Sequence, residues 1–161
     1  MDAADRSRAA VEDYIRELEA EFGSLSVSQT TFEVGAGHYQ RAVEQSSAGR
    51  LDVHALVEDE DGAVLLHEGD GEWVLPRGQT RPEESPGDAA ERVVSEAVGA
   101  DCTVTDAVKA TISGVRNGDD ASAETVYRLA VVFTVELIES PDAPGEAVRW
   151  DADRDPVSEV V

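Results

Sequence analysis

The sequence contains a single cysteine, Cys102, so no disulfide can form within the chain. Lysine is equally rare, because Lys109 is the only one and all other basic residues are arginines. No stretch approaches the roughly 20 apolar residues that a membrane-spanning helix requires, and the N-terminal "MDAADRSRAAVEDY" lacks the apolar core of a signal peptide. These absences predict a soluble, cytoplasmic protein that has no membrane partner.

Positive charge is what the chain lacks most. There are 13 Lys and Arg residues against 35 Asp and Glu residues, which gives a formal net charge of −22. Such a fold repels itself at low salt and is relieved by screening. Acidic residues are dispersed over all segments, so the chain resembles a halophilic, haloarchaeal protein, with an ordinary acidic mesophilic protein as the alternative. This charge argues against a broad phosphate-neutralising surface, and we expect no nucleic-acid partner.

The length of 161 residues predicts one main domain with a single sizeable core. An apolar stripe at helical spacing predicts a helix over residues 3–22; its members are Val11, Ile15, Leu18 and Phe22. "SVSQTTFEV" is typical of a strand, whereas "GAGHYQRAVEQ" fits either a second strand or a short helix. We expect residues 1–48 to form an N-terminal helix and extension, followed by a domain over residues 49–161.

From Leu51 onward the pattern changes to that of strands. "LDVHALVE" places alternate apolar residues on one face, "DEDG" is a turn signal, and "AVLLHE" is expected to return as the hairpin partner. A strand "EWVL", a loop over 77–87 and a helix over 88–98 follow. Strands are expected within 103–115 and 125–138, on either side of a loop over 116–124. "AVRWD" fits a last strand and "DPVSEVV" a stub of helix, which together predict a mixed α/β fold.

The segment 78–100 carries the most specific pattern in the chain. Six residues fall in register with one motif, without a gap: Gly78, Glu84, Arg92, Val94, Glu96 and Gly99. The segment resembles a Nudix box, and the resemblance covers roughly residues 50–155. It implies the Nudix-type fold, an α/β/α sandwich with a mixed sheet and a characteristic loop and helix. It also implies hydrolysis of a nucleoside diphosphate linked to another moiety, with Mg²⁺ or Mn²⁺ as cofactor.

The metal-binding half of the box is depleted. In the family, three glutamates on one helix face bind the cation, and their positions correspond to 93, 96 and 97. This chain has Val93, Glu96 and Ala97 there, so Glu96 is the one remaining ligand within the box. The backbone carbonyl of Arg77 is a ligand in some relatives. A substitute carboxylate could come from Glu124, or from its neighbours Asp119 and Asp120.

The resemblance further implies that Glu84 and Arg92 hold the loop to the helix, and with Glu96 they are the candidate catalytic residues. Arg77 and Arg81 are candidates for binding phosphate oxygens, and Trp73 for stacking on a base. Surface pairing of the arginines with Glu83 or Glu84, and simple packing of Trp73, are the alternatives. Arg116 and Arg128 carry the same ambiguity. The histidines are scattered and indicate no metal site; they are His38, His54 and His67.

Two functions remain open at this point, with a purely structural dimer as a third alternative. One is a metal-dependent Nudix hydrolase with a depleted metal site. The other is a non-catalytic Nudix-fold protein that binds a nucleotide or regulates a partner. Either would have a nucleotide-type small molecule as its partner, and a homodimer held by the N-terminal segment is left open.

Overall fold

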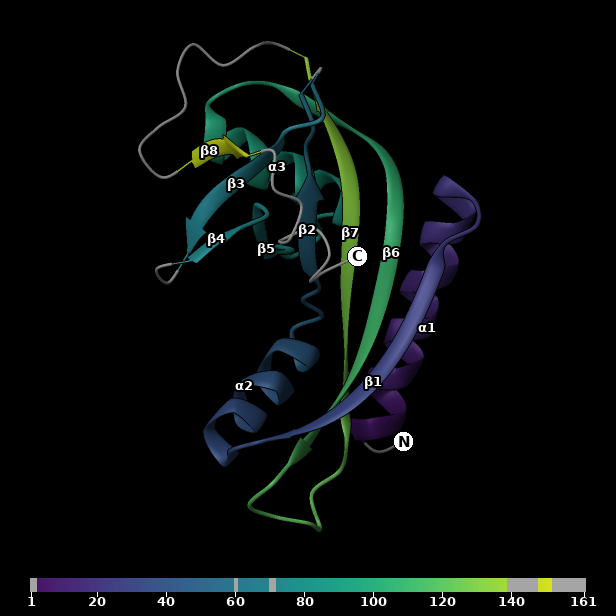
Figure 1. Ribbon diagram of the computed structural model, residues 1–161. Helices are drawn as coiled ribbons and strands as arrows, with labels where there is room; N and C mark the ends of the chain where they lie inside the picture. The colour runs from purple at the N-terminus through teal and green to yellow at the C-terminus, as the bar shows by residue number, and fades with distance from the viewer. Residues whose placement is uncertain (1–2, 60, 70–71, 139–147, 152–161) are drawn as a thin grey trace. The chain divides into compact units, whose positions relative to one another are not determined.

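A computed structural model describes residues 3–59, 61–69, 72–138 and 148–151 (Figure 1). The chain divides into two compact units, the first made of residues 1–52 and 109–131 and the second of residues 53–108 and 132–161. Two long strands, β6 (Cys102–Asn117) and β7 (Val126–Leu137), contribute to both units. None of the described helices is long and apolar enough to cross a membrane.

The first unit begins with the predicted helix, α1 (Ala3–Phe22), which buries Val11, Ile15 and Leu18. Ser7 fastens this helix to β7, because its buried hydroxyl accepts a hydrogen bond from the Tyr127 amide at 3.0 Å. The predicted strand is β1 (Ser26–Val34), which runs parallel to β6 over its whole length, as Figure 1 shows. In this unit β6 therefore lies between β1 and β7.

The segment with two alternatives forms a helix, α2 (Ala36–Ser47). Its N-cap, Gly35, has an extended backbone and no side chain, so it offers the first turn no hydrogen-bond acceptor. Asp119 supplies one instead, since its Oδ2 accepts a hydrogen bond from the Ala36 amide at 2.9 Å. A carboxylate is favourable at this end of a helix because the exposed amides carry partial positive charge. A residue 83 positions away thus caps the helix.

The second unit contains two groups of strands around one helix. In hydrogen-bonded order, β7 is followed by β2 (Asp52–Leu56) and β5 (Arg77–Gln79). A second, antiparallel sheet has the order β4 (Glu72–Val74), β3 (Val64–Gly69) and β8 (Val148–Asp151). A cluster of buried aliphatic residues fills the core, with Trp73 packed against it; its members are Leu56, Val64, Leu66, Leu75 and Val132.

Two expectations from the sequence need correction here. The turn after β2 forms, with Gly62 at a φ of 81° and the Asp59 carboxylate accepting hydrogen bonds from two amides of the turn. The expected hairpin forms only next to the turn, where Glu58 bridges Val64 and the amides of Asp59 and Leu65 donate to the carbonyls of Ala63 and Val57. Farther from the turn, β2 and β3 belong to different sheets. The expected loop over 77–87 also begins with the short strand β5. The strand expected in "AVRWD" is confirmed as β8, while "DPVSEVV" lies outside the described residues.

Candidate functional site

The helix of the motif, α3 (Pro86–Val98), has well-defined ends. Ser85 is its N-cap, and its hydroxyl accepts a hydrogen bond from the Asp88 amide at 3.1 Å. Pro86 occupies the first turn, where a missing amide proton costs nothing. Gly99 ends the helix in the left-handed region, with a φ of 69°. The sequence therefore fixes where α3 starts and stops, and with that it fixes which side chains face the loop before it.

Arg92 joins this helix to the loop and to β5. Its Nε donates to Glu84 Oε2 at 3.0 Å, and its Nη2 donates to Glu84 Oε1 at 3.1 Å and to the Gln79 carbonyl at 2.8 Å. The Arg81 amide also donates to Glu84 Oε1 at 3.0 Å. The pairing of Glu84 with Arg92 that the motif implies is therefore present as a two-pronged, charge-assisted contact.

The electrostatics of this pair follow from its geometry. The Arg92 hydrogen bonds lower the pKa of Glu84 below its ordinary value, and partial burial opposes that shift. The same hydrogen bond raises the pKa of Arg92. Only 16% of the Glu84 side chain and 19% of the Arg92 side chain are exposed. A carboxylate with both oxygens engaged by donors is a poor proton acceptor, so these contacts are those of residues that position the loop.

A pocket of about 240 Å³ lies between β5 and α3. It is lined by two basic residues, Arg77 and Arg92, by one carboxylate, Glu96, and by a mainly apolar remainder: His67, Pro76, Gly78, Val93 and Ala97. The predicted helix face thus lines the pocket, and two of its three metal-binding positions are apolar.

Gly78 shows how closely the two walls of this pocket approach. A Cβ atom at that position would lie 2.8 Å from Val93 Cγ2, nearer than side chains approach without moving. Any side chain at position 78 would therefore force Val93 to shift, whatever the pocket binds.

Glu96 is not free to act as an isolated ligand. Its Oε1 lies 3.5 Å from Arg81 Nη2, and its Oε2 lies 3.8 Å from Arg92 Nη1. Its side chain is 60% exposed, so these are weak surface contacts that a stronger partner can replace. Glu91 lies about 160° round the helix from Val93, and it is used elsewhere, since its Oε2 accepts a hydrogen bond from the Val104 amide at 2.8 Å.

The residues present do not fit the Mg²⁺ or Mn²⁺ ion that the motif implies. Hard divalent cations require several oxygen ligands, mostly carboxylates. Within the described part of the chain, no group of three or more His, Cys, Asp or Glu side chains is arranged to hold a metal ion. Glu96 and the Arg77 backbone carbonyl remain predicted ligands, but one paired carboxylate does not make a cation site.

The loop residues considered as substitute ligands have other partners in the first unit. Asp119 caps α2, and Asp120 accepts hydrogen bonds from the Ser122 amide and hydroxyl. The backbone carbonyl of Glu124 accepts a hydrogen bond from the Tyr39 hydroxyl at 2.5 Å. All three belong to the first unit, whereas the residues lining the pocket belong to the second. A metal-binding role for Glu124 stays a prediction.

The other candidates lie in different settings. Arg77 is exposed on β5 and lines the pocket. Arg81 is exposed and pairs with Glu96, which was not among the expected partners. The Arg149 guanidinium lies 4.3 Å from the centre of the Trp73 ring, so a stacking base would compete with a cation. His67 was missed as a pocket residue, because only the fold of β3 brings it to the motif.

Comparisons with known proteins bear on these observations. The model of the NUDIX domain family matches residues 48–156. Similar solved structures include an ADP-ribose pyrophosphatase from Streptococcus suis, with 22% identity and a TM-score of 0.44, covering 64% of this chain and 73% of that one. A UDP-X diphosphatase has 18% identity and a TM-score of 0.49, covering 74% and 60% of the two chains. A NUDIX hydrolase from Nitrosomonas europaea has 19% identity and a TM-score of 0.48, covering 66% and 58%. No curated protein sequence matches significantly.

The Arg92 contacts predict a specific loss of stability. Replacing Arg92 with Ala removes the guanidinium donor from the largely buried Glu84 carboxylate and from the Gln79 carbonyl, and we expect the free energy of unfolding to fall by about 2–3 kcal/mol. Arg81→Ala is the matched control, because it removes only an exposed ion pair and should cost less than about 1 kcal/mol. Urea unfolding of both variants in the same KCl buffer measures the difference. Equal losses would contradict the structural role of Arg92.

The lowered pKa of Glu84 predicts how stability depends on pH. Its contribution is fully present above the ordinary glutamate value of 4.5 and is lost as the pH falls through the lowered value in the folded protein. Glu84→Gln should therefore be less stable than the wild type above pH 5 or so, by an amount that shrinks as the pH falls below about 4.5. Unfolding curves over this range test it, with the exposed Glu83→Gln as control. A constant difference at all pH values would refute the assignment.

Proposed function

This chain belongs to the Nudix family, and we propose that it binds the diphosphate group of a nucleotide-type small molecule without hydrolysing it through a metal ion. The ligand class comes from the family, whose substrates are nucleoside diphosphates linked to another moiety. The observation that carries the proposal is the composition of the pocket. Arginines remain there, while Val93 and Ala97 stand where the cation-binding carboxylates would be.

The charges of the pocket favour direct contact with phosphate. In an intact box, three carboxylates repel a diphosphate unless a cation lies between them. Here Arg77 and Arg92 line the pocket against the single carboxylate Glu96. Glu96 is in turn within 4 Å of two guanidinium groups, which offsets its charge. A diphosphate can therefore meet arginine side chains without an intervening metal.

Each residue then has a distinct task. Arg77 is exposed and can donate to one phosphate group directly. Arg81 can exchange Glu96 for a phosphate at little cost, since an exposed ion pair contributes only about 0–1 kcal/mol. Arg92 stays with Glu84 and keeps β5, the loop and α3 in place. Val93 and Ala97 form an apolar wall of the pocket, and they supply neither a metal ligand nor a charge.

Hydrolysis remains the second candidate, and the retained Glu96 is the observation that favours it. Its side chain is 60% exposed at the pocket, so a substrate that draws Arg81 away would leave a carboxylate beside the bound diphosphate. In that case Glu96 would act on water or help to hold Mg²⁺.

Calorimetry and product analysis distinguish the two candidates. In molar KCl, we expect ADP-ribose or a UDP-sugar to bind with the same affinity in EDTA as in Mg²⁺, with no hydrolysis detected by chromatography. Arg77→Gln and Arg81→Gln should each weaken binding by about tenfold, because each removes a charge-assisted hydrogen bond. Arg116→Gln, an exposed arginine of the first unit, is the control. Turnover that requires Mg²⁺ and disappears in Glu96→Gln would replace this proposal with the hydrolase.

Introducing carboxylates at positions 93 and 97 tests whether their absence is what prevents the pocket from binding a metal ion. The double variant Val93→Glu/Ala97→Glu should bind Mn²⁺ more than about tenfold tighter than the wild type, because three carboxylates then share one helix face. Val93→Gln/Ala97→Gln is the matched control, with the same shape and no added charge. Electron paramagnetic resonance of free Mn²⁺ measures binding, and circular dichroism checks folding. Equal Mn²⁺ binding by the two folded variants would show that the missing carboxylates are not the limiting feature.

A further inference from the structure

A second cavity lies in the first unit and shares no residue with the motif pocket. Its volume is about 400 Å³, within the range of small-molecule sites. One face of α2 forms a wall, since His38, Arg41, Ala42 and Gln45 recur at helical spacing. The other walls come from β1, β6 and β7.

Arg128 gives this cavity a buried positive charge. Only 7% of the residue is exposed. Its Nη1 donates to the Arg50 carbonyl, but among the described residues no acceptor is in hydrogen-bonding position for its Nη2. Asp52, which also lines the cavity, is the nearest carboxylate, and its Oδ2 lies 3.5 Å from Nη2 as an ion pair without a hydrogen bond. Burial lowers the pKa of Arg128, and the Asp52 charge opposes that shift only in part.

Burying the Arg128 guanidinium with no acceptor for its Nη2 among the described residues costs free energy of folding. Burying a donor without an acceptor costs roughly 1–3 kcal/mol, and more for a charged group. Burial of an arginine is also unusual in an acidic chain that has only 13 basic residues. An anion bound in the cavity would lessen this cost through its charge, whereas surface pairing, the alternative considered from the sequence, does not account for a buried side chain.

Arg41 places a second cation at the same cavity. Its Nη2 lies 2.9 Å from His38 Nδ1. Arginine has only donors, so Nδ1 must accept, and the imidazole then carries its proton on Nε2. His38 thereby orients the Arg41 guanidinium and offers one further N–H donor. The cavity thus has two arginines, a histidine donor and one carboxylate, Asp52, among its described lining residues.

The remaining walls are suited to an apolar group. Phe32 is 44% exposed, which is high for a phenylalanine, and it lines the cavity with Val34, Val115 and Leu129. Phe32 and Val115 are register partners on neighbouring parallel strands, so they lie on the same face of the sheet. An aromatic or aliphatic group placed against them would cover Phe32 from water.

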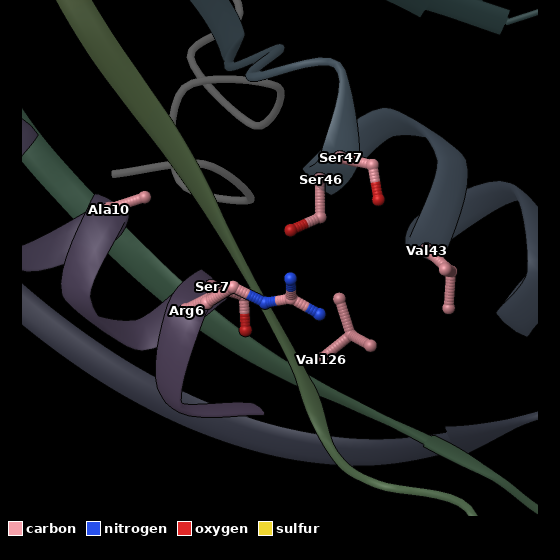
Figure 2. Close-up of a pocket in the computed structure, with 7 residues that line it drawn as sticks. All are labelled: Arg6, Ser7, Ala10, Val43, Ser46, Ser47 and Val126. Atoms are coloured by element: carbon pink, nitrogen blue, oxygen red, sulfur yellow. The ribbon is translucent and has the colours of Figure 1, made fainter. Parts of the chain in front are cut away.

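A neighbouring cavity of about 270 Å³ provides a contrast. Figure 2 shows the Arg6 guanidinium extending from α1 toward Val126 of β7, with the hydroxyls of Ser7 and Ser46 nearby. Arg6 is exposed, and the Ser7 hydroxyl is already paired with the Ala4 carbonyl and the Tyr127 amide. This cavity therefore has a cation and hydroxyls, but among the described residues it has no buried polar atom that lacks a partner.

We propose that the cavity lined by Arg41, Arg128 and Phe32 binds a small organic anion. Its phosphate or carboxylate group lies between the two arginines, and its apolar body packs against Phe32. The site is independent of the diphosphate pocket, so each can be present without the other.

Calorimetry with four simple probes tests this site on the full-length protein, in EDTA and at one fixed KCl concentration. Phenyl phosphate carries both features, inorganic phosphate carries only the anion, and phenol carries only the ring. Benzoate shows whether a carboxylate serves as well as a phosphate. We expect phenyl phosphate or benzoate to bind at least tenfold tighter than either inorganic phosphate or phenol.

The two exposed residues Arg41 and Phe32 supply the main variants, because they can be changed without unfolding the protein. Arg41→Gln should weaken binding of the organic anion at least tenfold. Phe32→Ala should weaken it similarly while leaving the affinity for inorganic phosphate unchanged. Arg128→Lys should also weaken it, since a single ammonium cannot serve both the Arg50 carbonyl and the ligand. The Arg41 and Phe32 variants decide the matter if this one does not fold.

Two matched controls locate the site. Arg6→Gln removes the arginine of the neighbouring cavity, and Arg77→Gln removes that of the diphosphate pocket; neither should change the affinity for the organic anion. The proposal is overturned if no probe binds saturably, if Arg41→Gln binds as tightly as the wild type, or if either control variant loses the binding instead.

Discussion

The pocket beside the motif helix depends on where Arg92 holds its neighbours. Its guanidinium contacts the carboxylate of the loop, the last residue of β5 and the next turn of α3. Arg77 and Gly78 lie on that strand, and Val93, Glu96 and Ala97 lie on that helix. Both walls of the pocket are therefore held by the partly buried pair of Arg92 and Glu84. The two hydrogen bonds of this pair fix the orientation of the side chains as well as their distance. The caps at Ser85 and Gly99 set the length of the helix, and Arg92 sets its rotation toward the loop.

Arginine lines both proposed binding cavities. With a net charge of −22, the protein repels an approaching anion, and salt confines this repulsion to about one Debye length from the surface. Anion binding at either proposed site then depends on short-range contacts, for which arginine is better suited than lysine. Its charge is delocalised and weakly hydrated, and its donors are rigidly spaced. Lys109, the one lysine, lies on β6 and lines neither cavity.

Local patterns were enough to predict much of the fold. Periodicity located α1 and the long strands, and capping signals placed α3 within two residues of its observed start. The pairing of Glu84 with Arg92 followed from the resemblance to a known motif. What local patterns left open or misplaced involves distant partners. The first turn of α2, a segment left open between strand and helix, is capped by Asp119, and beyond the turn β3 pairs with β4 and β8 rather than with β2. His67 and Arg128 carried no local signal, because their surroundings come from segments far away in the chain.

The contact between Gly78 and Val93 shows that part of the motif is a packing constraint. A methyl group of Val93 lies in the space that a side chain at position 78 would need. Glu84 and Arg92 likewise hold the loop to the helix. The fold alone accounts for these members of the motif, so their presence in a sequence is no measure of whether the pocket performs chemistry.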